Sequence, residues 1–165
     1  TEETVRGYNT YAKMNPPLRT WKDVQAIKDG LRDGTIDAIA TDHAPHASQE
    51  KQLGFTEAPF GIVGLETALP LTFALVDEGV LSLESAVDKL STAPAKAFGL
   101  AKGTLAVGAD ADVAIVDQQE QWEVDPAKFR SKSRNTPFAG WKVKGRVTTT
   151  IVGGRVVFEA AQAEP

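Results

Sequence analysis

The chain contains no cysteine and only two histidines among its 165 residues. Without cysteine, disulfides and thiolate metal sites are excluded, so a metal site in this chain would have to use His, Asp or Glu. Hydrophobic residues make up 42% of the chain and charged residues 24%, which is typical of a globular protein with a core of its own.

Long apolar runs are also missing. A membrane-spanning helix needs roughly 20 apolar residues, and the longest candidate, residues 60–75, is interrupted by Gly61, Gly64, Glu66, Thr67 and Pro70. The net charge is −4, and the Lys and Arg residues are scattered along the chain, so no basic surface for nucleic acid is indicated. We therefore expect no membrane or nucleic-acid partner, and a cytoplasmic location.

The amino terminus carries neither an initiating Met nor a signal peptide. Thr1 can cap a short helix, because Glu2 and Glu3 place negative charge in the first turn. We expect a piece of a longer protein.

Helical spacing dominates the first hundred residues. Thr20 can cap a helix whose apolar positions include Val24, Ile27 and Leu31, and Gly34 can end it. Further helices are expected over 64–78, with a kink near Pro70, over 83–90 after a Ser82 cap, and from Pro94 to Gly99. The apolar run 36–40 predicts a short, buried parallel strand.

The pattern changes near residue 102. Beyond Gly103, short β-like runs occur at 113–116, 147–152 and 156–158, with a Gly153–Gly154 turn before the last. The sequence therefore predicts two parts: residues 1–102, a strand and helices from an α/β barrel, and residues 103–165, a small β-rich domain.

The chemistry is concentrated directly after the predicted strand. Both histidines of the chain, His43 and His46, lie within four residues of Asp42. An acidic residue at the carboxyl end of a barrel strand points into the mouth where barrel enzymes place their active sites. There a carboxylate can bind a divalent metal and transfer a proton. The alternative is an Asx-turn aspartate beside solvated histidines, and the pattern alone names no reaction.

Several segments, in order, resemble the dihydroorotases of the amidohydrolase superfamily. They are Asn-Pro-Pro-Leu-Arg at 15–19, Asp-His-Ala-Pro-His at 42–46, Ala-Pro-Phe-Gly at 58–61 with Gly-Leu-Glu-Thr at 64–67, Gly-Ala-Asp-Ala-Asp at 108–112 and Ser-Arg-Asn-Thr-Pro-Phe at 133–138. The resemblance covers nearly the whole chain.

This resemblance implies an α/β fold: the carboxy-terminal part of a metal-dependent (β/α)8 TIM barrel plus a small β-sandwich domain. It implies the reversible, zinc-dependent hydrolysis of (S)-dihydroorotate to N-carbamoyl-L-aspartate in pyrimidine (UMP) biosynthesis. One or two zinc ions are implied, with most of their ligands upstream of residue 1. On its own, the chain is therefore expected neither to bind zinc tightly nor to turn over substrate.

Residue by residue, the resemblance implies that Asp42 is the metal-contacting catalytic acid and base. His46 and Asn15 would bind the substrate, with His46 at its carboxylate, and the backbone of Phe60 and Gly61 would contact the pyrimidine ring. Without the resemblance, Asn15 reads as a loop residue before proline, and Phe60–Gly61 as a turn.

Two neighbouring segments stay outside this assignment. His43 receives no role, and a structural one is as plausible as a chemical one. Residues 134–138 are interpreted as a structural return loop beside the β-rich part.

Other readings stay open at this point. Allantoinases and hydantoinases resemble the chain, but they usually lack a histidine at the place of His46 and an asparagine at that of Asn15. Another reading is a non-catalytic dihydroorotase-like subunit that partners aspartate transcarbamoylase; a homo-oligomer is also compatible with the resemblance.

Overall fold

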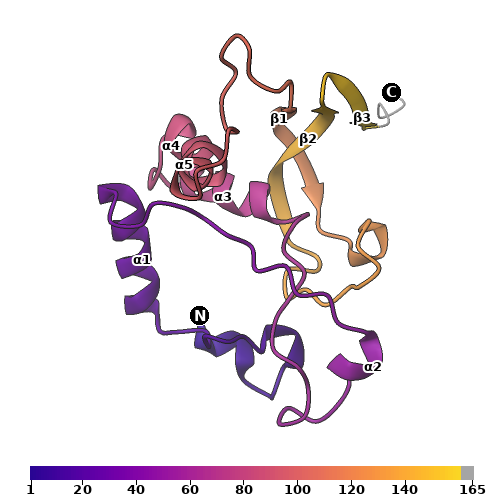
Figure 1. Cartoon of the computed structure of the whole chain (residues 1–165). Helices are drawn as coiled ribbons and strands as arrows, with labels where there is room; N and C mark the ends of the chain where they lie inside the picture. The colour runs from indigo at the N-terminus through magenta and orange to yellow at the C-terminus, as the bar shows by residue number, and fades with distance from the viewer. Residues whose placement is uncertain (161–165) are drawn as a thin grey trace.

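Helices precede residue 98 and strands follow residue 112 in the computed structural model, which describes residues 1–160 (Figure 1). The helices are α1 (Trp21–Asp33), α2 (Ser48–Lys51), α3 (Ala68–Asp77), α4 (Leu83–Val87) and α5 (Ala93–Ala97), and the strands are β1 (Val113–Glu123), β2 (Lys142–Val152) and β3 (Arg155–Glu159). Short 3₁₀ turns lie at Glu2–Val5, Thr10–Ala12 and Pro126–Lys128, and a π turn at Asp88–Thr92 joins α4 to α5. No helix within these residues is long and apolar enough to cross a membrane.

The predicted ends of α1 are confirmed. The Thr20 side chain accepts a hydrogen bond from the Asp23 N–H, and the Asp23 carboxylate accepts one from the Thr20 N–H, which forms a capping box. Gly34 ends the helix with a φ of 86°, a left-handed conformation that glycine adopts without strain. Local sequence thus fixes both ends of this helix.

The prediction of a strand at residues 36–40 is wrong. This stretch forms no strand, and the Ile39 N–H instead donates to the carbonyl of Lys89 at 2.9 Å. The buried Lys89 ammonium in turn donates to the Ile36 carbonyl. A parallel strand exists only through bonds to neighbouring strands, and within residues 1–160 no strand lies beside this segment.

Pro70 does not interrupt its helix. It lies in the first turn of α3, where the missing N–H removes no intrahelical hydrogen bond. Ser82 caps α4 through the Ser85 N–H, as predicted. The π turn then carries the chain directly into α5, and Gly99 ends the run with a φ of 64°.

The carboxy-terminal strands form one antiparallel sheet in the order β1-β2-β3. Gly153 and Gly154, with φ of 54° and 75°, make the two-residue turn between β2 and β3 that the sequence predicted. Residues 1–160 contain this single sheet, so the β-sandwich and the boundary at residue 102 stay predictions.

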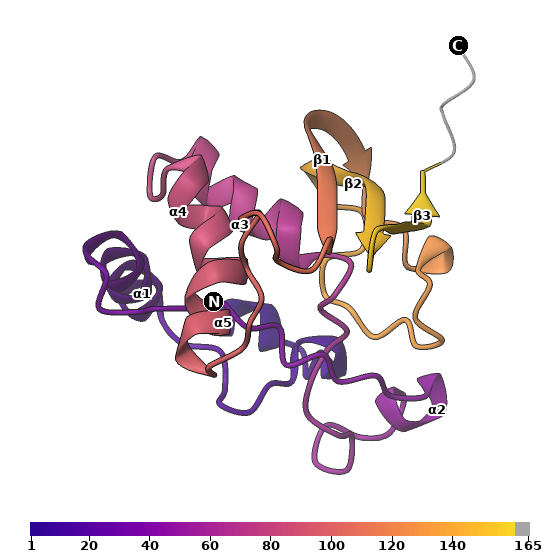
Figure 2. The ribbon, with the colours of Figure 1, turned by 45° about the horizontal axis from the view of Figure 1, so that its top comes forward.

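Helix α3 lies between helices α1 and α4 on one side and the sheet on the other (Figure 2). On one side, Leu31, Val80, Leu81 and Ala86 form a buried apolar cluster with Leu75 and Val76 of α3. On the other side, Phe73 of α3 packs against Gly145 of β2. A second cluster of Val63, Val124 and Phe129 joins the loop after residue 61 to the β-rich part.

We expect Gly145→Ala to destabilise the protein. Gly145 has a φ of 98°, and an added Cβ would collide with the buried Phe73 ring, so strain and overpacking together should cost about 1–3 kcal/mol. The matched control is Gly140→Ala, since Gly140 has a φ of 78° but open space around its Cα. Thermal unfolding should show a clearly larger fall in Tm for Gly145→Ala; equal falls would contradict the packing argument.

Candidate functional site

Asp42 adopts a backbone conformation that is uncommon for a residue with a side chain. Its φ is 41°, in the left-handed region that aspartate enters more readily than most residues. The residue is exposed. Within residues 1–160 its carboxylate has neither a hydrogen-bond nor an ion-pair partner, so its oxygens are available to a metal ion or a transferred proton. A strained residue of this kind is a reasonable candidate for function.

Backbone hydrogen bonds join four distant segments beside Asp42. The Ala44 N–H donates to the Ile62 carbonyl at 2.8 Å, and the Gly61 N–H donates to the Lys13 carbonyl at 2.8 Å. The Val63 N–H completes the set by donating to the Asn135 carbonyl at 3.0 Å. The segments that carry the predicted site residues therefore meet around the stretch 61–63.

Close backbone approach between two of these segments requires glycine. A Cβ built on Gly61 would lie 2.5 Å from the Cβ of Ala44, and the φ of Gly61 is 106°. A Cβ on Gly64 would lie 3.0 Å from the Cβ of Thr41. The loop that carries Asp42 thus lies directly against the loop that follows Phe60.

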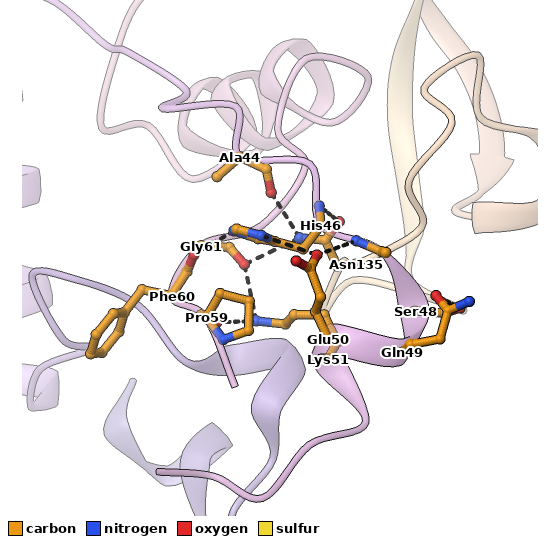
Figure 3. A network of polar contacts seen from close by, with 11 residues as sticks. Ala44, His46, Ser48, Gln49, Glu50, Lys51, Pro59, Phe60, Gly61 and Asn135 are labelled. Atoms are coloured by element: carbon orange, nitrogen blue, oxygen red, sulfur yellow. Dashed lines mark hydrogen bonds and ion pairs between the residues drawn. The ribbon is translucent and has the colours of Figure 1, made fainter. Parts of the chain in front are cut away.

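His46 links two of the predicted substrate-binding elements (Figure 3). Its Nε2 lies 2.8 Å from the carbonyl oxygen of Phe60, and because a carbonyl only accepts, Nε2 carries the hydrogen in this contact. Its Nδ1 lies 3.8 Å from the Glu50 carboxylate. The structure therefore brings His46 and the Phe60–Gly61 backbone together.

His43 contacts the loop that precedes α3. Its Nδ1 accepts hydrogen bonds from the N–H groups of Gly64 and Leu65, at 3.1 and 3.4 Å. An accepting Nδ1 carries no proton, so the ring is held in one orientation beside the loop that precedes α3. The sequence left this residue unassigned.

Asn135, which is distant in sequence, forms hydrogen bonds with both loops of the site (Figure 3). Its side chain is 2% exposed. Its amide group donates to the carbonyls of Ala44 and Gly61 at 2.8 and 3.2 Å, while its oxygen accepts from the His46 N–H at 3.2 Å. The loop 134–138 was predicted to be structural; no spacing in the sequence indicated that it braces this site.

Two buried lysines, which sequence reasoning missed, lie under the same loop. Lys13 and Lys51 are only 7% and 1% exposed. The Lys13 ammonium donates to the carbonyls of Phe55, Thr56 and Ala58, and that of Lys51 donates to the carbonyls of Pro59 and Gly61. Burial lowers the pKa of Lys51 below its ordinary value, and the nearby positive charge of Lys13 lowers it further.

Asn15 lies two residues beyond Lys13, whose carbonyl pairs with Gly61. The residue is exposed, and its side chain donates and accepts no hydrogen bond within residues 1–160. The structure therefore places Asn15 next to the segment that pairs with the loop, with its amide available to a ligand.

The part of the chain that the structure describes contains no group of three or more His, Cys, Asp or Glu residues able to hold a metal ion. Asp42 is a suitable oxygen ligand for zinc, but a zinc site needs further ligands. Asp42 therefore fits as one ligand of a larger set.

Comparison with known proteins gives consistent matches. Residues 12–157 match the model of the amidohydrolase family. The chain is 58% identical over 160 residues to a dihydroorotase of Geobacter sp. (strain M21), which covers 97% of this chain and 38% of that protein. It is 57% identical over 158 residues to a dihydroorotase of Syntrophotalea carbinolica, covering 96% of this chain and 37% of that one. The chain therefore spans well under half the length of these relatives.

Solved structures match over a similar share of this chain. The L-hydantoinase (dihydropyrimidinase) from Arthrobacter aurescens aligns with a TM-score of 0.90 and 36% identity, over 100% of this chain and 38% of that one. A dihydropyrimidinase from Brevibacillus agri aligns with a TM-score of 0.88 and 31% identity, over 96% and 36% of the two chains. Together with the dihydroorotases, these matches confirm the resemblance that the motifs indicated.

Proposed function

Because the chain belongs to the amidohydrolase family, we propose that it forms the carboxy-terminal part of a dihydroorotase. The reaction would be the reversible hydrolysis of (S)-dihydroorotate to N-carbamoyl-L-aspartate in pyrimidine biosynthesis. The observation that supports this most directly is the 58% identity over 160 residues to a protein named dihydroorotase, against 36% for the L-hydantoinase.

The architecture proposed for the whole protein follows from the same relatives. Residues 1–102 would complete a metal-dependent (β/α)8 barrel, and residues 103–165 would belong to a small β-rich domain. A cytoplasmic location and an association with a second copy or with aspartate transcarbamoylase stay predictions.

Asp42 would do the proton chemistry. One or two zinc ions, held by Asp42 and by ligands outside this chain, would supply a water of lowered pKa and polarise the ring carbonyl. The Asp42 carboxylate would take a proton from the attacking water and deliver it to the departing ring nitrogen. Its lack of a protein partner within residues 1–160 supports this role, because both oxygens stay available.

The substrate would be held by the elements that meet at residues 61–63. His46 and Asn15 would bind its carboxylate side: the Asn15 amide can donate to an anion, and the His46 Nε2–H would do so by exchanging its contact with the Phe60 carbonyl for the substrate. The backbone at Phe60 and Gly61 would contact the pyrimidine ring. The Phe60 N–H donates no hydrogen bond to any residue between 1 and 160, which leaves it for a ring carbonyl oxygen.

A hydantoinase-like cyclic amidohydrolase is the second candidate, and the TM-score of 0.90 with the L-hydantoinase favours it. The free carboxylate of dihydroorotate separates the two substrates chemically, because most hydantoins lack one. His46 and Asn15 are therefore the residues on which the choice depends.

The full-length protein should hydrolyse dihydroorotate with a kcat/KM at least about 100-fold above that for hydantoin or allantoin, as expected where the polar groups of a site match one substrate. Removal of metal by a chelator should abolish turnover, and added zinc should restore it. Steady-state assays on the three substrates measure this. Preference for hydantoin, or full activity after metal removal, would contradict the proposal.

A further inference from the structure

We infer that Lys13 and Lys51 are positioning residues that hold the backbone at Phe60 and Gly61 in the orientation that binds substrate. The inference rests on the proposed function for the role of that backbone. It adds residues that lie beneath the site and do not touch the substrate themselves.

Side-chain donors form hydrogen bonds with almost every carbonyl of the loop 55–61. Between residues 55 and 61, every carbonyl except that of Glu57 accepts a hydrogen bond from a side chain. The donors and acceptors are Lys13 to Phe55, Thr56 and Ala58, Lys51 to Pro59 and Gly61, His46 to Phe60, and Asn135 also to Gly61. The two lysines supply most of these contacts, so they take the place of the strand pairing that the loop lacks.

The two lysines bind the carbonyls that flank Phe60. Lys51 lies 2.8 Å from the Pro59 carbonyl and 3.3 Å from that of Gly61, the residues on either side (Figure 3). The Lys13 ammonium donates to the Ala58 carbonyl and also lies 4.4 Å from the centre of the Phe60 ring. With the flanking carbonyls drawn toward the lysines, the Phe60 peptide has little freedom to rotate.

A purely structural role explains these residues less well. No carboxylate forms an ion pair with Lys13 or Lys51 within residues 1–160, and burial lowers the pKa of Lys51. Burying two neighbouring ammonium groups is unfavourable, and apolar side chains of similar size often stabilise such positions as well or better. What lysine adds is directional donation to chosen carbonyls, and these flank the substrate-binding peptide.

The test uses Lys51→Met in the full-length protein, since methionine has a similar length and no donor. We expect KM for dihydroorotate to rise about 10- to 100-fold while kcat stays within about 3-fold, the pattern of an interaction lost equally from ground and transition states. Lys51→Arg, which keeps a cation with N–H donors, should lie closer to the parent. Lys13→Met should raise KM in the same direction and provides a second variant if Lys51→Met fails to fold.

Lys89→Met is the matched control. Lys89 is as buried as Lys13 and also donates to a carbonyl, that of Ile36, but within residues 1–160 it forms no hydrogen bond with the loop 55–61. It should lower Tm without raising KM. An equal rise in KM for Lys89→Met, or an unchanged KM for Lys51→Met, would overturn the inference.

Amide hydrogen exchange separates this inference from the proposed function. In Lys51→Met the amides of Gly61 and Val63, which donate to the carbonyls of Lys13 and Asn135, should exchange at least about 10-fold faster than in the parent without any ligand present, because local opening becomes easier. If the parent does not hydrolyse dihydroorotate, the proposed function fails. This measurement would still show whether Lys51 holds the backbone of the loop in place. Unchanged exchange at these amides would overturn the positioning role.

Discussion

Asp42→Asn in the full-length protein is expected to lower kcat for ring opening of dihydroorotate by about 10²–10⁴-fold, the usual contribution of a general acid and base. Asparagine keeps the size of the side chain and tolerates the left-handed φ of 41° found here. The backbone should therefore be preserved, and the loss should fall on proton transfer and metal binding.

Steady-state kinetics together with metal analysis would measure the effect. The matched control is Asp37→Asn, an exposed acidic residue of the same segment, which should keep kcat within about 2-fold as a surface substitution. A normal rate for Asp42→Asn with metal bound would remove the basis of the proposed mechanism.

Local sequence signals predicted the parts of the fold that depend on few neighbours. The Thr20–Asp23 capping box, the Gly34 end of α1 and the Gly153–Gly154 turn are each formed within a few residues. In such cases the side chain or glycine that satisfies the backbone is adjacent in sequence, so the pattern is sufficient.

The segment 36–40 shows where local sequence signals no longer predict the structure. Its apolar composition fits a buried strand, but a strand is defined by partners, and within residues 1–160 its hydrogen bonds go to Gly30 and Lys89 instead. Composition alone cannot supply the neighbouring strands on which the prediction depended.

The predicted site depended on resemblance for its residues and on the structure for its supports. The motif residues His46, Phe60 and Gly61 are brought together as expected. Lys13, Lys51 and Asn135 were not identified, because lysine and asparagine are normally exposed and their burial follows only from tertiary packing. A donor that is 74 residues distant from its acceptor, as with Asn135 and Gly61, leaves no periodic signal.

The second large effect is expected from Asn135→Asp. This nearly isosteric change keeps the oxygen that accepts from the His46 N–H, but it replaces the amide donor with a carboxylate oxygen facing the carbonyls of Ala44 and Gly61. The Ala44 carbonyl would lose its side-chain donor and that of Gly61 would keep only Lys51, both beside a new charge in a part-buried position, so the free energy of unfolding should fall by about 3 kcal/mol or more. Denaturant unfolding measures it, and KM should rise as the Gly61 loop loosens.

Asn9→Asp makes the same chemical change where only the acceptor is used. The Asn9 oxygen accepts from the Tyr11 N–H at 3.1 Å, at the start of the 3₁₀ turn Thr10–Ala12, and a carboxylate caps such a turn equally well. Its unfolding free energy should therefore stay within about 0.5 kcal/mol of the parent. If Asn135→Asp were as mild as Asn9→Asp, the Asn135 amide could not be what holds the loop of His46 against that of Gly61, because the donor would be gone and the contact would remain.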